Sequence, residues 1–270
     1  MTTYAVKSWD QCGDTLALTG AVRNVRVCYP EFSFVYVGNP YYKPLLDENE
    51  DFIPSGFGKR LKPICYGTGE KRADRGTIIE ANTKTLCEYI GIDNVPITCT
   101  TAHVVLTQGE INWGKRFEGK WLLNANCQTC SINKGYPHWQ GVVDCMHDLG
   151  LDVVQVGGRE RRDLSTDLNG VEDWRGKTNL REWLSMVYNC AGIVSPPSGI
   201  IHAGAIWGVP MVCVTGAREH TGITAYPTVR HVTSECDNQY CMNDGCKHYD
   251  GKWCECMSSI EPERIATLCL

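Results

Sequence analysis

The sequence predicts an α/β protein of two Rossmann-like, doubly wound domains that face each other across a cleft, with a cysteine-rich loop near the C-terminus. Two observations favour this architecture. The chain opens with a strand, a helix with apolar residues at helical spacing and a second strand, and the same pattern restarts after residue 120,. A strand–helix–strand order implies parallel strands, so two such series predict two sheets. One continuous sheet is the alternative.

The expected elements follow the alternation of apolar runs and turn residues. In the first half we expect strands at residues 4–7, 32–37 and 102–106, helices at residues 15–28 and about 82–90, and glycine-, proline- and charge-rich loops at residues 38–80,. In the second half we expect strands at residues 121–124, 152–156, 192–195 and 211–215 and helices at residues 138–149, 180–190 and 200–207. The polar stretch 107–120 separates the halves, so the predicted domains are residues 1–118 and 119–270.

Composition bounds the class of protein. The chain has 270 residues, of which 43% are hydrophobic and 21% charged, as in globular proteins,. It has no apolar run of about 18 residues, so we expect no membrane span,. The N-terminus lacks the pattern of a signal peptide, which predicts a cytoplasmic protein,. The net charge of −5 argues against a general nucleic-acid binder, although a local basic patch is compatible with it,.

A polar turn that opens a small-residue helix is the clearest candidate site. Residues 195–199 read Ser-Pro-Pro-Ser-Gly and precede the helix expected at residues 200–207. Backbone N–H groups and the positive end of the helix dipole favour an anion at such a turn, which makes Ser198 and Gly199 candidate diphosphate ligands. His202 follows one helical turn later on the same face,. The alternative is an ordinary crossover whose glycines only allow close packing.

Loops that follow other expected strands carry further candidates. Asp14 lies in the first strand-to-helix loop, where its carboxylate is a candidate general base toward a hydroxyl; a helix-start aspartate favoured by the dipole is the alternative,. Lys134 lies in the matching loop of the second half, beside Thr129 and Ser131, and is a candidate phosphate ligand or else a solvated charge.

Two further groups of charged residues lie in loops. Arg159 and Glu160 follow a strand end and are candidates for a ribose or base contact, or else form a surface ion pair. A basic segment spans residues 58–76 and is either a solvated loop or a surface that attracts an anionic acceptor. Its charged residues are Lys59, Arg60, Lys62, Lys71, Arg72 and Arg75.

Cysteines are abundant, with 16 in the chain, and five gather at residues 236–256. Without a secretory signal a disulfide framework is not expected, and concentrated thiols point to a structural zinc or iron. The expected ligands are Cys241, Cys246, Cys254 and Cys256, with Cys236 as a substitute. The spacing is not that of a standard zinc finger, and a reduced, metal-free loop is the alternative.

Four segments in the same order resemble glycosyltransferase family 9, the ADP-heptose:lipopolysaccharide heptosyltransferases, over nearly the full chain. They are the loop ending Gly13-Asp14 with its following helix, residues 129–139 with Lys134 and Trp139, residues 180–216, and the cysteine-rich tail. The resemblance implies the GT-B fold, with an acceptor held by the first domain and a nucleotide-diphosphate sugar, an ADP-sugar above all, held by the second. The implied acceptor is a lipopolysaccharide-type glycan or another anionic molecule.

The resemblance also implies roles for residues. Asp14 would deprotonate the acceptor hydroxyl, and the attack would invert the anomeric carbon without a metal. Thr129, Lys134, Ser198 and Gly199 would hold the leaving diphosphate, with His202 in support,. Some family members are similar in holding a structural iron with cysteines in this region.

The chain departs from the family at Pro197, where the heptosyltransferases carry an aspartate that holds the sugar. Proline has no side-chain acceptor, so the resemblance implies the reaction class rather than heptose as the sugar. Two alternatives stay open: a glycosyltransferase that acts on modified DNA bases, and a catalytically silent scaffold that binds a nucleotide sugar.

Overall fold

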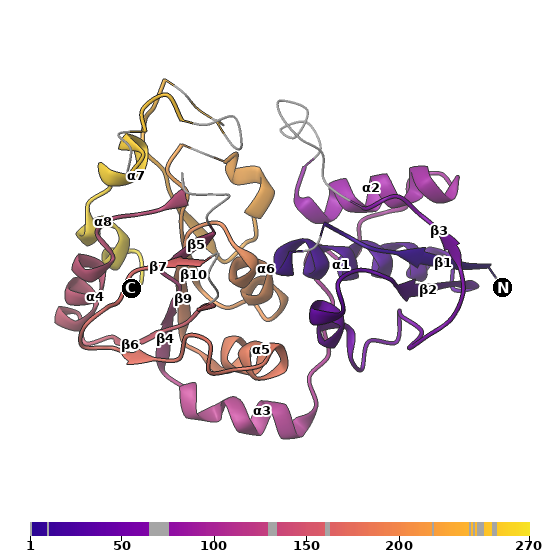
Figure 1. Cartoon of the computed structure of the whole chain (residues 1–270), viewed down its shortest axis with the longest axis horizontal. Helices are drawn as coiled ribbons and strands as arrows, with labels where there is room; N and C mark the ends of the chain where they lie inside the picture. Colours follow the sequence, from indigo (N-terminus) through magenta and orange to yellow (C-terminus); the bar gives the residue numbers. More distant parts are fainter. Residues whose placement is uncertain are drawn as a thin grey trace.

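Two parallel sheets divide the chain. The computed structural model describes residues 2–9, 11–64, 76–128, 134–159, 163–217, 219–237, 239, 241, 246–249 and 253–270. Figure 1 shows the smaller sheet of the N-terminal half at the right and the larger sheet of the C-terminal half at the left. The arrangement confirms the prediction of two Rossmann-like units, and one continuous sheet is excluded among the described residues.

The N-terminal half is a βαβ unit with additions. β1 (Thr2–Val6) pairs in parallel with β2 (Phe32–Tyr36) and β3 (Lys59–Arg60) in the order β2-β1-β3. α1 (Cys12–Cys28) joins β1 to β2 and packs against α2 (Ile78–Ile90). α2 begins at a capping box on Thr77 and ends at Gly91, whose φ of 77° suits glycine,. A 3-10 helix, η1 (Pro40–Leu46), lies within the predicted loop region.

The C-terminal half is a doubly wound sheet of six parallel strands in the order β11-β10-β9-β4-β6-β8. Its strands are β4 (Lys120–Leu123), β6 (Asp152–Gln155), β8 (Glu172–Asp173), β9 (Gly192–Ser195), β10 (Met211–Val214) and β11 (Val229–Val232). Its helices are α4 (Trp139–Asp148), α5 (Leu180–Asn189), α6 (Gly199–Ile206), α7 (Glu255–Ser258) and α8 (Pro262–Thr267), with the 3-10 helix η5 (Thr221–Thr224). A separate antiparallel pair joins β5 (Asn126–Gln128) to β7 (Asp163–Ser165).

The predicted strand at residues 102–106 is wrong, because this segment forms no strand. Its backbone is bonded to side chains instead of to a neighbouring strand. Thr19 Oγ1 accepts a hydrogen bond from the backbone N–H of His103 at 2.8 Å, and Asn49 Nδ2 donates to the carbonyl of His103 at 2.7 Å. Apolar side chains in the segment nonetheless point inward, since Ala102 and Val104 are buried.

The polar stretch between the halves contains α3 (Gln108–Gly114) and a 3-10 helix, η3 (Lys115–Phe117). α3 starts at a capping box formed by Thr107 and Glu110, and it packs against α5 of the C-terminal half. Arg181 of α5 contacts both oxygens of Glu110 at 2.7 Å and donates to the carbonyl of Val105 at 2.6 Å. The halves are therefore joined by an ion pair as well as by chain connection.

Apolar packing also connects the halves. One hydrophobic cluster extends from α1 and the N-terminal sheet to α6 and one face of the C-terminal sheet, and a second covers the opposite face together with α4 and α8. No helix in the described part of the chain is both long and apolar enough to cross a membrane. The cysteines whose side chains the structure describes are free thiols.

Candidate active site

The candidate site lies where the strand order of the larger sheet reverses. β4 is the first strand of this half, and it lies between β6 on one side and β9 on the other. Loops at the carboxyl ends of β4 and β9 therefore diverge and leave a crevice, which is where doubly wound proteins bind ligands. The first loop leads to Lys134, and the second leads through Pro197 to α6.

The N-terminus of α6 is built as the sequence predicts. Ser198 is its N-cap residue, with extended backbone angles, yet its hydroxyl does not cap the helix. Instead the Ser198 hydroxyl lies 2.9 Å from Ser195 Oγ and accepts from Asn124 Nδ2 at 3.2 Å. This network holds the turn and leaves the backbone N–H groups of the first helical turn without a side-chain cap from Ser198, which is the arrangement of a helix end that can bind an anion,.

Lys134 lies beside this helix end. Its ammonium donates to the carbonyl of Pro197 at 2.9 Å and pairs with Glu219 Oε1, also at 2.9 Å. The side chains of Lys134 and Glu219 are only 19% and 10% exposed, so the pair is largely shielded from water. A fixed cation next to a helix N-terminus is an arrangement suited to phosphate oxygens.

His202 supports the turn from within the protein. Its Nδ1 lies 2.8 Å from the hydroxyl of Tyr226, and its side chain is buried. Burial lowers the pKa of His202 to about 4, so the imidazole is neutral at pH 7,. A neutral, buried imidazole fixes the helix rather than contributing a charge to the crevice.

Asp14 lies on the other side of the crevice, in the first turn of α1. The N-terminal ends of α1 and α6 are in close contact because glycines face each other there. A methyl group built at Gly13 would lie 2.9 Å from Cδ2 of His202, and one at Gly199 would lie 3.2 Å from Cβ and Sγ of Cys12. α1 and α6 lie side by side between the two sheets (Figure 1). The fold therefore brings Asp14 and the turn of Ser198 together across the two halves.

The remaining predicted ligands are less closely associated with the crevice. Arg159 forms an ion pair with Asp173, and its side chain is 55% exposed, which matches the surface ion pair named as its alternative. Lys59, Arg60 and Lys62 are exposed on and after β3. Thr129, Ser131, Glu160, Lys71, Arg72 and Arg75 lie outside the residues that the structure describes.

Three partners in the crevice were not predicted from the sequence. Asn124, Glu219 and Tyr226 respectively hold Ser198, Lys134 and His202. Asn124 directly follows β4, so its position at a strand end was the one available signal. Glu219 and Tyr226 lie in the loop after β10, and only the tertiary fold shows what they contact.

The cysteine-rich segment forms a second cluster near the C-terminus. Burial raises the pKa of Cys254, and its hydrogen bond with the Cys246 thiol raises it further, followed by the nearby thiols of Cys256 and Cys241. The thiols of Cys246 and Cys254 are thus in contact, but the four predicted ligands do not converge as a group within the described part of the chain.

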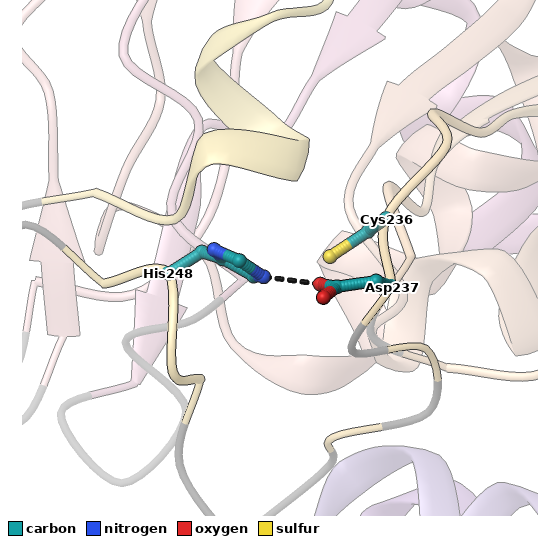
Figure 2. Close-up of side chains that lie close together, drawn as sticks. All are labelled: Cys236, Asp237 and His248. Carbon is teal, nitrogen blue, oxygen red and sulfur yellow. Dashed lines mark hydrogen bonds and ion pairs between the residues drawn. The ribbon is translucent and has the colours of Figure 1, made fainter.

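The side chains whose potential metal-binding atoms lie close together are not the four predicted cysteines. Among the described residues, Cys236, Asp237 and His248 are the group of three potential ligands whose atoms all lie within 4.8 Å of one another. Figure 2 shows the three side chains pointing toward one another, with His248 Nε2 bonded to Asp237 Oδ1. Of the predicted cysteines, Cys236, named as a substitute, belongs to this group.

Comparisons with known proteins agree with this fold. The profile of glycosyltransferase family 9 (heptosyltransferase) matches residues 92–250, more than half of the chain. No curated protein matches the chain in sequence. The solved structure of ADP-heptose LPS heptosyltransferase II from E. coli is 14% identical, with a TM-score of 0.71, and the match covers 99% of this chain and 97% of that one.

Two other solved structures have the same fold. A family 9 glycosyltransferase from Veillonella parvula is 16% identical with a TM-score of 0.68, covering 99% of this chain and 97% of the other. The iron-containing dodecameric TibC of enterotoxigenic E. coli, also solved in complex with ADP-D-β-D-heptose, is 14% identical with a TM-score of 0.67, covering 99% and 74%.

The two parallel sheets and these structural matches show the GT-B fold. The family profile covers more than half of the chain and therefore shows the family. The chain belongs to glycosyltransferase family 9.

Proposed function

We propose that the protein transfers a sugar from a nucleoside diphosphate to a hydroxyl group of an anionic acceptor, with inversion at the anomeric carbon. The observation that carries this proposal is the placement of Asp14 on α1 opposite the helix end at Ser198 and the ammonium of Lys134. Gly13, the neighbour of Asp14, packs against Gly199 and His202 of α6, so a base on α1 and an anion at α6 would face each other, as transfer from a diphosphate requires.

The residues divide the reaction into two parts. The Asp14 carboxylate accepts the proton of the acceptor hydroxyl as that oxygen bonds to the anomeric carbon from the face opposite the diphosphate. The bond between that carbon and the diphosphate oxygen breaks, and the oxygen takes the electron pair. Lys134 and the backbone N–H groups at Gly199 stabilise the negative charge that develops there. His202 keeps α6 in place.

The donor is proposed from a structural relative, and the acceptor from the exposed basic side chains of the N-terminal half. An ADP-sugar is the favoured donor substrate, supported by the complex of TibC with ADP-D-β-D-heptose. Exposed Lys59, Arg60 and Lys62 in the N-terminal half suit an anionic glycan, with residues 1–118 as the acceptor domain and residues 119–270 as the nucleotide-sugar domain,. Pro197 leaves the identity of the sugar open. The comparisons give no support to a nucleic-acid acceptor, and none is proposed.

The cysteine-rich segment is proposed to hold a structural metal ion. Thiolate, imidazole and carboxylate ligands suit zinc or ferrous iron, and Cys236, Asp237 and His248 already converge,. The thiols of Cys246 and Cys254 are available nearby as further ligands. The ion would link Cys236 and Asp237 to His248, and the transfer itself would not use it. Elemental analysis of protein purified without added metal should give about one ion per chain, and a content near zero would contradict this proposal.

The transfer proposal is tested by a binding and turnover screen. The protein is mixed with ADP, UDP, GDP, CDP and their sugar conjugates, and thermal stabilisation is measured, because ligands of the native state raise its stability. We expect one nucleotide to stabilise the protein clearly. Lys134→Met should weaken that binding, whereas Lys120→Met, whose lysine pairs with Glu172 at the amino end of β4, should not. Equal responses of the two variants would contradict the phosphate site.

A further inference from the structure

A buried hydrogen bond joins Tyr226 to His202 of α6. The tyrosine hydroxyl lies 2.8 Å from Nδ1 of the imidazole, and the two rings meet edge to face. Tyr226 is held in the turn before β11, where its backbone N–H donates to the carbonyl of Thr224 at 2.8 Å and its own carbonyl accepts from the N–H of Val229 at 3.0 Å. The hydroxyl is therefore a fixed partner for the imidazole ring.

Burial decides which of the two groups donates in this hydrogen bond. Tyr226 is 4% exposed, and burial raises the pKa of its hydroxyl, so the hydroxyl keeps its proton,. Among the residues that the structure describes, His202 is the one side chain that bonds to this hydroxyl. A buried hydroxyl that only accepted would leave its own proton unbonded, which is costly. The Tyr226 hydroxyl therefore donates, and Nδ1 of His202 accepts.

A neutral imidazole whose Nδ1 accepts a hydrogen bond carries its proton on Nε2. The edge of the ring that bears Nε2 faces α1, because a methyl group built at Gly13 would lie 2.9 Å from Cδ2 and 3.4 Å from Nε2 of His202. Within the described part of the chain no group accepts a hydrogen bond from Nε2, although His202 is only 7% exposed. The fold thus places a largely buried N–H donor beside α1, next to the residue that precedes Asp14, where it can bond to an atom from outside the chain.

We propose that Tyr226 is a positioning residue that holds the imidazole proton of His202 on Nε2, so that the ring donates a hydrogen bond to a substrate oxygen between α1 and α6. The inference rests on the proposed function for the identity of that oxygen, which belongs to the diphosphate at the helix end of Gly199. The opposite tautomer would present the lone pair of Nε2 to the same negatively charged oxygen. The Tyr226 hydroxyl thereby sets whether the ring attracts or repels the group that leaves during transfer.

The position of the proton is measured by nitrogen NMR of isotope-labelled protein at pH 7, because protonated and unprotonated imidazole nitrogens resonate far apart. The signals of His202 are assigned by their loss in His202→Asn. We expect the wild-type ring to carry its proton on Nε2. Tyr226→Phe removes the donor to Nδ1 and should redistribute the proton between the two nitrogens. A wild-type ring protonated on Nδ1, or an unaltered ring in Tyr226→Phe, overturns the proposal.

Nucleotide binding shows whether the position of the proton matters to the substrate. Calorimetry with ADP, UDP, GDP and CDP identifies the nucleotide that binds, and Tyr226→Phe should weaken its affinity about threefold to tenfold, the loss expected for one hydrogen bond. Tyr136→Phe is the matched control, because the Tyr136 hydroxyl is also buried and donates to the carbonyl of Ile260 at 2.8 Å. This control should leave both the nucleotide affinity and the His202 tautomer unchanged.

The two measurements separate this inference from the function on which it rests. Equal nucleotide affinities in Tyr226→Phe and Tyr136→Phe overturn the substrate contact of His202 while leaving the transferase proposal standing. If the wild-type protein binds no nucleotide at all, the proposed function and the substrate contact both fail, whereas the NMR result still decides the role of Tyr226 in setting the tautomer. The wild-type tautomer is read without any substitution, so the proposal stays testable if a variant fails to fold.

Discussion

The ion pair between Glu110 and Arg181 gives the most quantitative prediction, because it joins the two halves of the molecule. Both guanidinium contacts to the carboxylate are 2.7 Å long, and Arg181 also reaches the carbonyl of Val105. Hydrogen bonding from Arg181 lowers the pKa of Glu110 from 4.5 to about 2. Glu110→Gln removes the charge but keeps the shape, and it should destabilise the protein.

The size of the effect follows from this pKa. A fall from 4.5 to about 2 corresponds to about 3 kcal/mol in the absence of screening,. The Glu110 side chain is 25% exposed, so solvent screening reduces the expected loss to about 1.5 kcal/mol,. For a chain of this length, that loss lowers Tm by about 4 °C.

The pH dependence has a definite sign. Because the pKa of Glu110 is lower in the folded state, its stabilisation is complete above about pH 4.5 and is lost as pH falls toward 2,. The variant has no such group to titrate. The difference in Tm between wild type and Glu110→Gln should therefore be constant from pH 6 to 8 and shrink between pH 4.5 and 2.

Thermal unfolding followed by circular dichroism measures this difference, and Glu182→Gln is the matched control. Glu182 holds the same capping-box position in α5 that Glu110 holds in α3, and it accepts from the backbone N–H of Asn179 at 2.9 Å. The control removes the charge at the same cap position, where the glutamine oxygen still accepts the backbone hydrogen bond. Equal Tm values for the two variants at pH 7 would refute the claim that the contact with Arg181 stabilises the protein.

Two further predictions concern the contact of α1 with α6. Gly13→Ala places a methyl group 2.9 Å from the His202 ring and should cost about 1–3 kcal/mol of unfolding free energy,. Gly109→Ala, whose methyl group would lie 4.0 Å from Thr107 Oγ1, should be neutral. Unfolding in urea compares the two variants, and equal stability would contradict close packing at Gly13. Because burial lowers the pKa of His202 to about 4, its neutral form contributes stability that is lost as pH falls from 6.5 toward 4, by at most about 3 kcal/mol,. His202→Asn should reduce the dependence of unfolding free energy on pH in this window, and an unaltered slope would count against a buried neutral His202.

The sequence predicts the strands of the larger sheet well because they are continuous apolar runs bounded by turn residues. β4, β6, β9 and β10 all lie within a residue of their expected bounds. β11 was missed because Arg230 and His231 interrupt its apolar pattern. α3 is short and polar, and its capping box at Thr107 was the one signal available for it.

The candidate site was predictable only where local rules apply. Ser198 and Lys134 were found because they follow strand ends, and those positions converge in any doubly wound sheet. Glu219 is 85 residues from Lys134 along the chain, so no local pattern reports their contact. The strand expected at residues 102–106 was wrong for a different reason. The apolar pattern correctly predicted that side chains of this segment are buried, but it could not predict that the backbone forms no strand.

The central claim is that one crevice holds a base on α1 and a diphosphate at α6, and the most direct measurement is sugar transfer by Asp14→Asn. Binding of the nucleotide is measured in the same preparation, because the Lys134 site lies on the opposite half of the molecule. The account predicts a loss of transfer of about 100-fold or more, as expected for a general base, with unaltered nucleotide affinity. Transfer at the wild-type rate would contradict the assignment of Asp14 as the base.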